Sequence, residues 1–112
     1  MRAALVQLSV SDDPAANLPG TVDLVRRAFA AGADIALTPE CTNALSSNRT
    51  RQQSLFRHEA EDPTLAALSD EAARAGRWLL VGSLGLLTGE ADGRFANRSL
   101  LIAPDGSVAA RY

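Results

Sequence analysis

The sequence is poor in cysteine and aromatic residues and has no long apolar run, and each shortage excludes a class of protein. One cysteine among 112 residues cannot form an intramolecular disulfide, which favours a reducing compartment. Aromatic residues make up 4% of the chain and the net charge is −2, which leaves few stacking platforms and no basic surface for nucleic acid. No apolar run is long enough to span a bilayer, and the short one after Met1-Arg2 has the pattern of a strand, not of a signal peptide. We therefore expect a cytoplasmic protein with no nucleic-acid or membrane partner.

The rest of the composition is that of an ordinary globular protein, with 46% hydrophobic and 21% charged residues. At this length we expect one domain, residues 1–112. Apolar segments predict strands, and apolar residues at helical spacing predict helices. The expected strands are 3–10, 35–37, 78–84, 95–103 and 107–112, and the expected helices are 14–31, 63–75 and a short one at 50–57. The order β-α-β-α-β followed by a hairpin predicts a mixed α/β sheet with helices on one or both faces.

Local signals mark the ends of the two longer helices. Asp13-Pro14 and Asp62-Pro63 each place an N-cap acid before a proline of the first turn. Gly32 and Gly76 follow the last helical residues, where a left-handed backbone commonly ends a helix. Pro19-Gly20 lies inside the first helix and leaves two alternatives open: a kinked helix, or a helix that begins at Pro19 after a loose first turn.

The stretch Ala33–Asn43 carries the strongest candidate for a functional residue. Its apolar run Ile35–Leu37 is typical of a central parallel strand, and Pro39, which has no N–H, should end that strand. Sites in open α/β sheets form beyond the carboxyl ends of strands, which is where Glu40 lies. We expect Glu40 to be held beneath the strand end. The alternative is that Glu40 is a solvated loop acid.

Several stretches, in order along the whole chain, resemble the nitrilase superfamily of carbon–nitrogen hydrolases. They are Ala4–Leu8, Asp13–Leu18, Ala31–Asp34, Pro39–Glu40, Leu79–Ser83, Phe95–Ser99, Pro104–Gly106 and Arg111–Tyr112. Within that family, Pro39–Asn43 and Phe95–Ser99 most resemble bacterial amidases similar to ω-amidase and deaminated-glutathione amidase.

The resemblance implies a fold and a reaction. The fold is the amino-terminal part of an αββα sandwich, incomplete in this chain, and the reaction is hydrolysis of nonpeptide C–N bonds through a Glu, a Lys and a Cys. Glu40 takes the role of general base, which removes the thiol proton before attack. The matching Lys and nucleophilic Cys lie beyond Tyr112, so we expect the chain alone to be inactive. The resemblance also implies a small amide as substrate, no cofactor, and a homo-oligomer in the complete protein.

Two other interpretations stay open. In one, the chain is a non-catalytic truncated or split product that needs a partner segment to fold. In the other, Cys41 is the nucleophile of a thiol hydrolase together with His58. Adjacent residues in an extended stretch point to opposite sides, which should keep Glu40 and Cys41 apart, so a small buried side chain is favoured for Cys41. His58 is expected to be solvated, and one histidine with one cysteine lacks the spacing of metal ligands.

Other polar residues and the size of the sheet give further expectations. Arg49, Arg51 and Arg57 could bind a substrate carboxylate, but a solvated helix face is favoured. Asn97 is expected to be a structural residue near the sheet. Because two helices cannot cover both faces of such a sheet, some apolar surface should be left bare.

Overall fold

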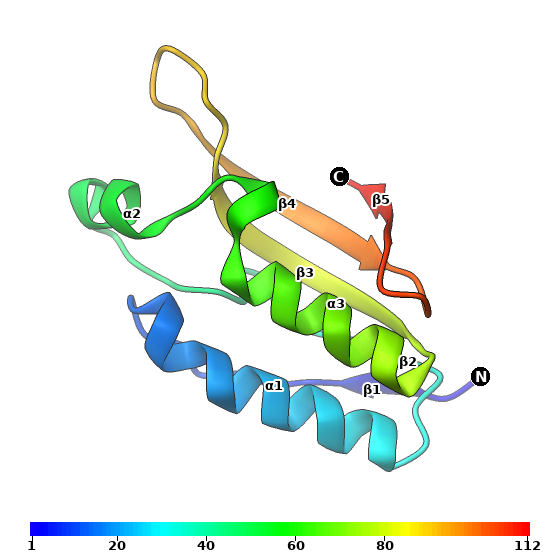
Figure 1. Ribbon diagram of the computed structural model, residues 1–112. Coiled ribbons are helices and arrows are strands. Elements are labelled where there is room, and N and C mark those ends of the chain that lie inside the picture. Colours follow the sequence, from blue (N-terminus) through cyan, green and yellow to red (C-terminus); the bar gives the residue numbers. More distant parts are fainter.

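The computed structural model describes residues 1–112 as one sheet with helices (Figure 1). The sheet has five strands in the order β1-β2-β3-β4-β5. The strands are β1 (Ala3–Leu5), β2 (Ile35–Leu37), β3 (Trp78–Leu87), β4 (Phe95–Ile102) and β5 (Val108–Arg111). The helices are α1 (Pro14–Ala30), α2 (Arg49–Leu55) and α3 (Pro63–Ala75), with a 3₁₀ turn, η1 (Glu59–Glu61), before α3. This arrangement confirms the predicted mixed α/β fold.

The first three strands are parallel and the last three are antiparallel. Parallel neighbours need long crossovers, and these contain the helices, whereas short turns join β3 to β4 and β4 to β5. The register places Leu5 beside Leu37, Leu37 beside Leu80, and Leu80 beside Leu101. These four leucines therefore form one row across the same face of the sheet.

Two strands differ from the prediction by more than one residue at an end, whereas β4 and β5 each differ by at most one residue at either end. The prediction of a strand over residues 3–10 was wrong in its length, because β1 ends at Leu5. Its neighbour β2 has only three residues, so beyond the bond from Val6 N–H to the Leu37 carbonyl (2.8 Å) the chain has no strand to pair with. Strand β3 extends past the predicted end at residue 84, because β4 accompanies it as far as the pair Leu87–Phe95.

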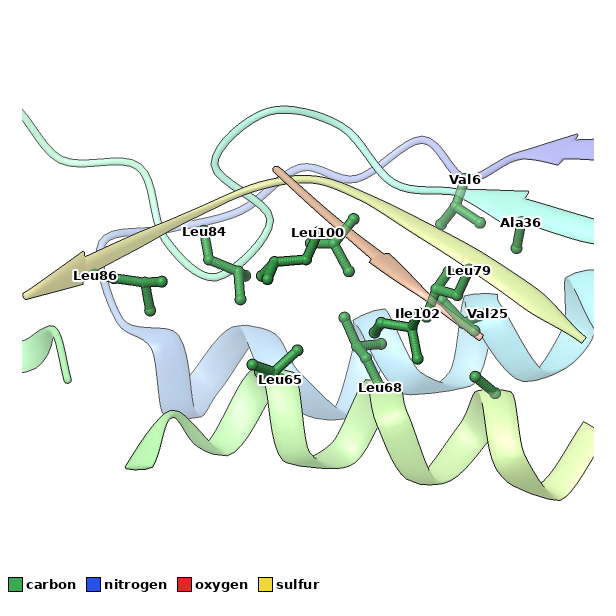
Figure 2. Packing of buried hydrophobic residues seen from close by; sticks show 12 residues of the cluster. Val6, Val25, Ala36, Leu65, Leu68, Leu79, Leu84, Leu86, Leu100 and Ile102 are labelled. Atoms are coloured by element: carbon green, nitrogen blue, oxygen red, sulfur yellow. The ribbon is translucent and has the colours of Figure 1, made fainter. Parts of the chain in front are cut away.

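The hydrophobic core lies between the sheet and helices α1 and α3, which cover the same face (Figure 2). Val25 of α1 and Leu68 of α3 are fully buried there. The sheet contributes fully buried side chains from three strands: Ala36, Leu79, Val81, Leu84, Leu86, Leu100 and Ile102. Burying one such leucine or valine is worth about 1.5–3 kcal/mol relative to leaving it exposed, so this layer is the main source of stability.

The helices begin and end at the predicted signals. Asp13 accepts hydrogen bonds from the N–H groups of Ala15 and Ala16, and Asp62 accepts one from Leu65 N–H at 2.8 Å. Glycines in left-handed conformation follow α1 and α3, at φ +94° and +63°. Helix α1 begins at Pro14 and contains Pro19, so the alternative start at Pro19 was wrong.

Helix α2 spans Arg49–Leu55, one residue earlier at its start than the predicted 50–57 and two residues shorter at its end. Asn48 is its N-cap, because its Oδ1 accepts a bond from Arg51 N–H at 3.0 Å. Phe56, which follows the helix, is buried.

The second face of the sheet carries neither α1 nor α3, as Figure 1 shows. In the parallel part of the sheet, Leu5 is 81% exposed and Trp78 is 40% exposed on this face. Leu37, Leu80 and Leu101 of the leucine row are only partly buried. The expected bare apolar surface is therefore present. No helix in the structure has the length and apolar character to cross a membrane.

Candidate active site

Glu40 lies in the loop that follows β2, and one side chain holds its carboxylate. Asn97 Nδ2 of β4 donates a hydrogen bond to Glu40 Oε1 at 2.8 Å. Successive side chains of a strand point to opposite faces of the sheet. Arg98, the residue after Asn97, points to the side of α1 and α3, where its Nη1 lies 3.2 Å from Glu59 Oε1. Asn97 and Glu40 therefore lie on the face opposite α1 and α3. The expectation that Glu40 lies beneath the strand end was wrong: Glu40 is exposed, because the strands beside it leave this face open.

The loop reaches this position because β3 has a glycine where the loop crosses it. A Cβ on Gly82 would lie 2.4 Å from the Thr38 carbonyl oxygen and 2.5 Å from the Pro39 carbonyl carbon. No side chain fits at such distances, so only glycine lets Pro39 pass this close to the strand. Glu40, the next residue, is thereby placed directly above the sheet.

Hydrogen bonds from β3 fix the residues that follow Glu40. Cys41 N–H donates to Ser83 Oγ at 2.8 Å, and Thr42 N–H donates to the Ser83 carbonyl at 2.9 Å. The amide of Asn43 bonds both backbone groups of Gly85: its Oδ1 accepts from Gly85 N–H and its Nδ2 donates to Gly85 C=O, each at 2.9 Å. Asn43 thus takes the place on β3 that a longer β2 would occupy.

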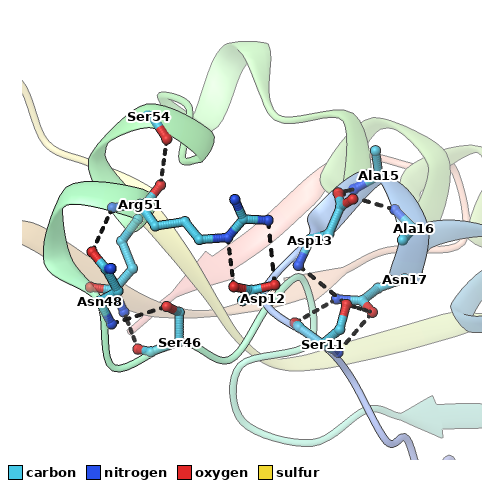
Figure 3. A network of polar contacts seen from close by, with 11 residues as sticks. Ser11, Asp12, Asp13, Ala15, Ala16, Asn17, Ser46, Asn48, Arg51 and Ser54 are labelled. Carbon is cyan, nitrogen blue, oxygen red and sulfur yellow. Dashed lines mark hydrogen bonds and ion pairs between the residues drawn. The ribbon is translucent and has the colours of Figure 1, made fainter.

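Asn17 of α1 belongs to a polar network at the start of that helix, which Figure 3 shows, and it also bonds the loop after Glu40. Asn17 Nδ2 donates to the carbonyl of Asn43 at 2.9 Å, and Asn17 Oδ1 accepts from Ser11 N–H at 2.9 Å. Arg51 of α2 reaches Asp12, with Nε 2.5 Å from Oδ2. The segment after Glu40 is therefore held from β3, from α1 and from the chain beyond β1.

Cys41 is beside Glu40 but has the properties of a structural residue. Burial, with a smaller contribution from the Glu40 charge, raises the pKa of the Cys41 thiol, which disfavours the thiolate that a nucleophile needs. The prediction of an extended backbone here was wrong, because Cys41 has a left-handed conformation with φ +55°. His58 is exposed and its Nδ1 lies 3.2 Å from the Leu87 carbonyl, and no hydrogen bond joins it to Cys41.

A hollow of about 170 Å³ adjoins the Glu40–Asn97 pair. Cys41 and Asn97 line it on the side of the pair, together with Phe56 and Phe95, whose rings meet edge to face at 5.3 Å. Arg49 lies 4.8 Å over the Phe95 ring. The hollow is therefore largely apolar, with polar groups at one end and a guanidinium near the aromatic wall.

The three arginines considered as carboxylate ligands have different surroundings. Arg51 is paired with Asp12, as described above, and Arg57 Nη1 donates to the carbonyls of Ser54 and Phe56, each at 3.1 Å. Only Arg49 lies against a wall of the hollow. The three side chains do not converge on one site.

The arrangement around Glu40 offers one group for acid–base chemistry. An exposed carboxylate can accept a proton from a nearby thiol or water. The sequence contains no lysine to stabilise an oxyanion, and no group of three or more His, Cys, Asp or Glu side chains is placed to hold a metal ion. The structure brings Glu40 together with Asn97, a contact that sequence reasoning missed. The only available signal was the run of polar residues 97–99 inside β4.

Residues 2–112 match the family model of carbon–nitrogen hydrolases. The chain belongs to the carbon–nitrogen hydrolase family. Among the relatives of this hydrolase chain, the omega-amidase NIT2 of Mus musculus is 32% identical over 111 residues, which are 99% of this chain and 38% of the relative. The resemblance to the nitrilase superfamily, with ω-amidase-like relatives, is thereby confirmed. The chain spans 38% of the length of this relative and of the omega-amidases of Pongo abelii and Xenopus laevis.

Solved structures have the same fold. The NitFhit protein of C. elegans superposes with a TM-score of 0.87 at 22% identity, over 98% of this chain and 26% of that one. An amidase from Nesterenkonia sp. superposes with a TM-score of 0.77 at 27% identity, over 100% of this chain and 41% of that one. In one variant of this amidase, acrylamide has added to the active-site cysteine.

Proposed function

We propose that residues 1–112 form the amino-terminal part of an amidase in which Glu40 is the general base. The observation that carries this proposal is the exposed Glu40 carboxylate beyond β2, held at 2.8 Å by Asn97. Membership of the carbon–nitrogen hydrolase family supports the type of bond that is cleaved. The omega-amidase and amidase relatives favour a small amide as substrate.

The proposed reaction uses Glu40 twice. Glu40 first takes the proton of a cysteine thiol, and the thiolate attacks the amide carbon to form a tetrahedral oxyanion, which a lysine stabilises. The protonated Glu40 then returns the proton to the nitrogen, the C–N bond breaks, and ammonia leaves an acyl-thioester. Water, deprotonated by Glu40, attacks the thioester, so that the carboxylic acid is released and the thiol is restored.

The lysine and the cysteine come from the segment that follows residue 112. This proposal agrees with the absence of lysine in the chain and with the raised pKa of the Cys41 thiol. The active-site cysteine of the Nesterenkonia amidase is a precedent for a cysteine in this role. The hollow beside Asn97 offers about 170 Å³, enough for the acyl part of a small amide. A cytoplasmic location and a homo-oligomeric complete protein remain predictions.

The test compares four proteins in an assay for ammonia release from short amides of dicarboxylic acids. They are the 112-residue chain, a longer chain that carries the lysine and cysteine segment, and the longer chain with Glu40→Gln or Cys41→Ala. We expect no measurable turnover in the short chain and turnover in the longer one. Glu40→Gln should lower turnover by about 10²–10⁴-fold, the usual contribution of a general base. Cys41→Ala is the matched control and should leave turnover nearly unchanged.

Two results would replace this proposal by one of the alternatives. Turnover in the short chain that disappears with Cys41→Ala would favour the thiol hydrolase. A longer chain that folds but releases ammonia from no amide would favour a non-catalytic product.

A further inference from the structure

The Glu40 side chain has a single hydrogen-bond partner, and that partner lies on strand β4. The bond from Asn97 Nδ2 at 2.8 Å is the one contact that selects an orientation for the exposed Glu40 side chain. An exposed glutamate without such a partner moves among several staggered rotamers. We infer that Asn97 is the positioning residue of the site: it holds Oε1 of Glu40 and leaves Oε2 directed to the reacting groups.

This inference rests on the proposed role of Glu40 as general base. Holding a base in one geometry matters for rate because a displacement of about 1 Å at the reacting centre can cost about 100-fold. Asn97 therefore contributes through Glu40 and not by touching substrate. Its effect should be on turnover more than on substrate binding.

The anchoring of Asn97 explains why it can hold a loop side chain in place. Asn97 lies opposite Gly85 in the β3–β4 ladder. On the side of β3 away from β4, the backbone N–H and C=O of Gly85 are hydrogen-bonded to the side-chain amide of Asn43, which belongs to the same loop as Glu40. Asn97 and the loop that carries Glu40 therefore both meet β3 at Gly85, Asn97 on the β4 side and Asn43 on the opposite side. This arrangement places Asn97 within reach of the loop that carries Glu40.

The charge of the holding group is also significant. Asn97 is neutral, so it orients the carboxylate without an ion pair, and none of the ion pairs of the chain includes Glu40. The titratable group next to Glu40 is the Cys41 thiol, and Arg98 is turned to the other face, where Glu59 binds it. An aspartate at position 97 would place a second carboxylate at hydrogen-bond distance and disfavour ionisation of Glu40.

The test is a double-mutant cycle on turnover in the longer, active protein, with succinamate as the amide. Asn97→Ala should lower kcat by about 10- to 100-fold with little change in KM. In the Glu40→Gln background the same change should alter kcat by less than about twofold, because the group that Asn97 positions is gone. Arg98→Gln, on the same strand but the opposite face, is the control and should leave kcat unchanged.

A second measurement serves if Asn97→Ala fails to fold or the doubly substituted protein is too slow. The acid limb of the pH profile of kcat/KM should move up by about one pH unit or more in Asn97→Asp. Equal losses of kcat from Asn97→Ala in both backgrounds, or an Asn97→Asp profile that does not move, would overturn the positioning role while Glu40 remains the base. A wild-type longer protein without turnover would refute the general base and the positioning role together.

Discussion

Asn43→Ala should destabilise the protein more than any other change in the loop that carries Glu40. Asn43 is 1% exposed, and both polar atoms of its amide bond the backbone of Gly85 at 2.9 Å. Alanine removes both bonds and leaves the N–H and C=O of the buried Gly85 without partners. No neighbouring strand can replace the lost bonds, because β2 ends at Leu37.

The magnitude follows from the two groups that lose their partners. A buried donor or acceptor without a partner costs about 1–3 kcal/mol. Two such groups, with some relief from water that enters at the loop, give an expected loss of about 2–5 kcal/mol. Small domains are stable by about 5–15 kcal/mol in total, so this change removes a large fraction of the stability.

The assay is urea unfolding followed by circular dichroism, at several protein concentrations so that association is separated from unfolding. Asn43→Ala should lower the urea midpoint with an unchanged slope. Asn48→Ala is the matched control: it removes the N-cap of the exposed helix α2 and should cost about 1 kcal/mol. A loss from Asn43→Ala no larger than that of Asn48→Ala would refute the reasoning that Asn43 replaces a strand.

Two more predictions concern the helix layer and the open face. The hydrogen bond from Arg26 lowers the pKa of Glu71 below its ordinary 4.5, so the ionised form stabilises the fold. The stability gap between the wild type and Glu71→Gln should be constant above about pH 5 and shrink as pH falls below 4.5 toward the lower folded pKa, as measured by urea midpoints; a gap independent of pH would contradict it. The 112-residue chain should bind a hydrophobic dye through its open face, and Leu5→Lys with Trp78→Lys should reduce the signal. A sharp, concentration-independent thermal transition without dye binding would count against an uncovered face.

The sequence by itself determined the helices, because their signals are local. An N-cap aspartate satisfies N–H groups two or three residues away, and a glycine ends a helix through its own backbone angle. Asp13, Asp62, Gly32 and Gly76 therefore predicted both ends of α1 and α3. That β2 ends before Pro39, at Leu37, was predictable for the same reason, since a missing N–H acts at its own position.

Strand lengths were decided by the partners of each strand and not by the strands themselves. Residues 6–10 have an apolar pattern suited to a strand, but β2 is too short to pair with them. Leu87 continues β3 because Phe95 lies opposite it. A pattern of apolar residues indicates that a segment can form a strand, whereas the neighbouring strand determines how far it does.

For the candidate site too, one part could be predicted from the sequence and the other was decided by the fold. Position and chemistry singled out Glu40, because a carboxylate after a strand-ending proline can be read from consecutive residues. Its partner Asn97 is 57 residues away in the sequence, and its side chain meets Glu40 only because Gly82 lets the loop cross β3 closely. Nothing near either residue in the sequence encodes that contact. Folding of the sheet brings the two side chains to within 2.8 Å, so the tertiary structure alone decided how Glu40 is oriented.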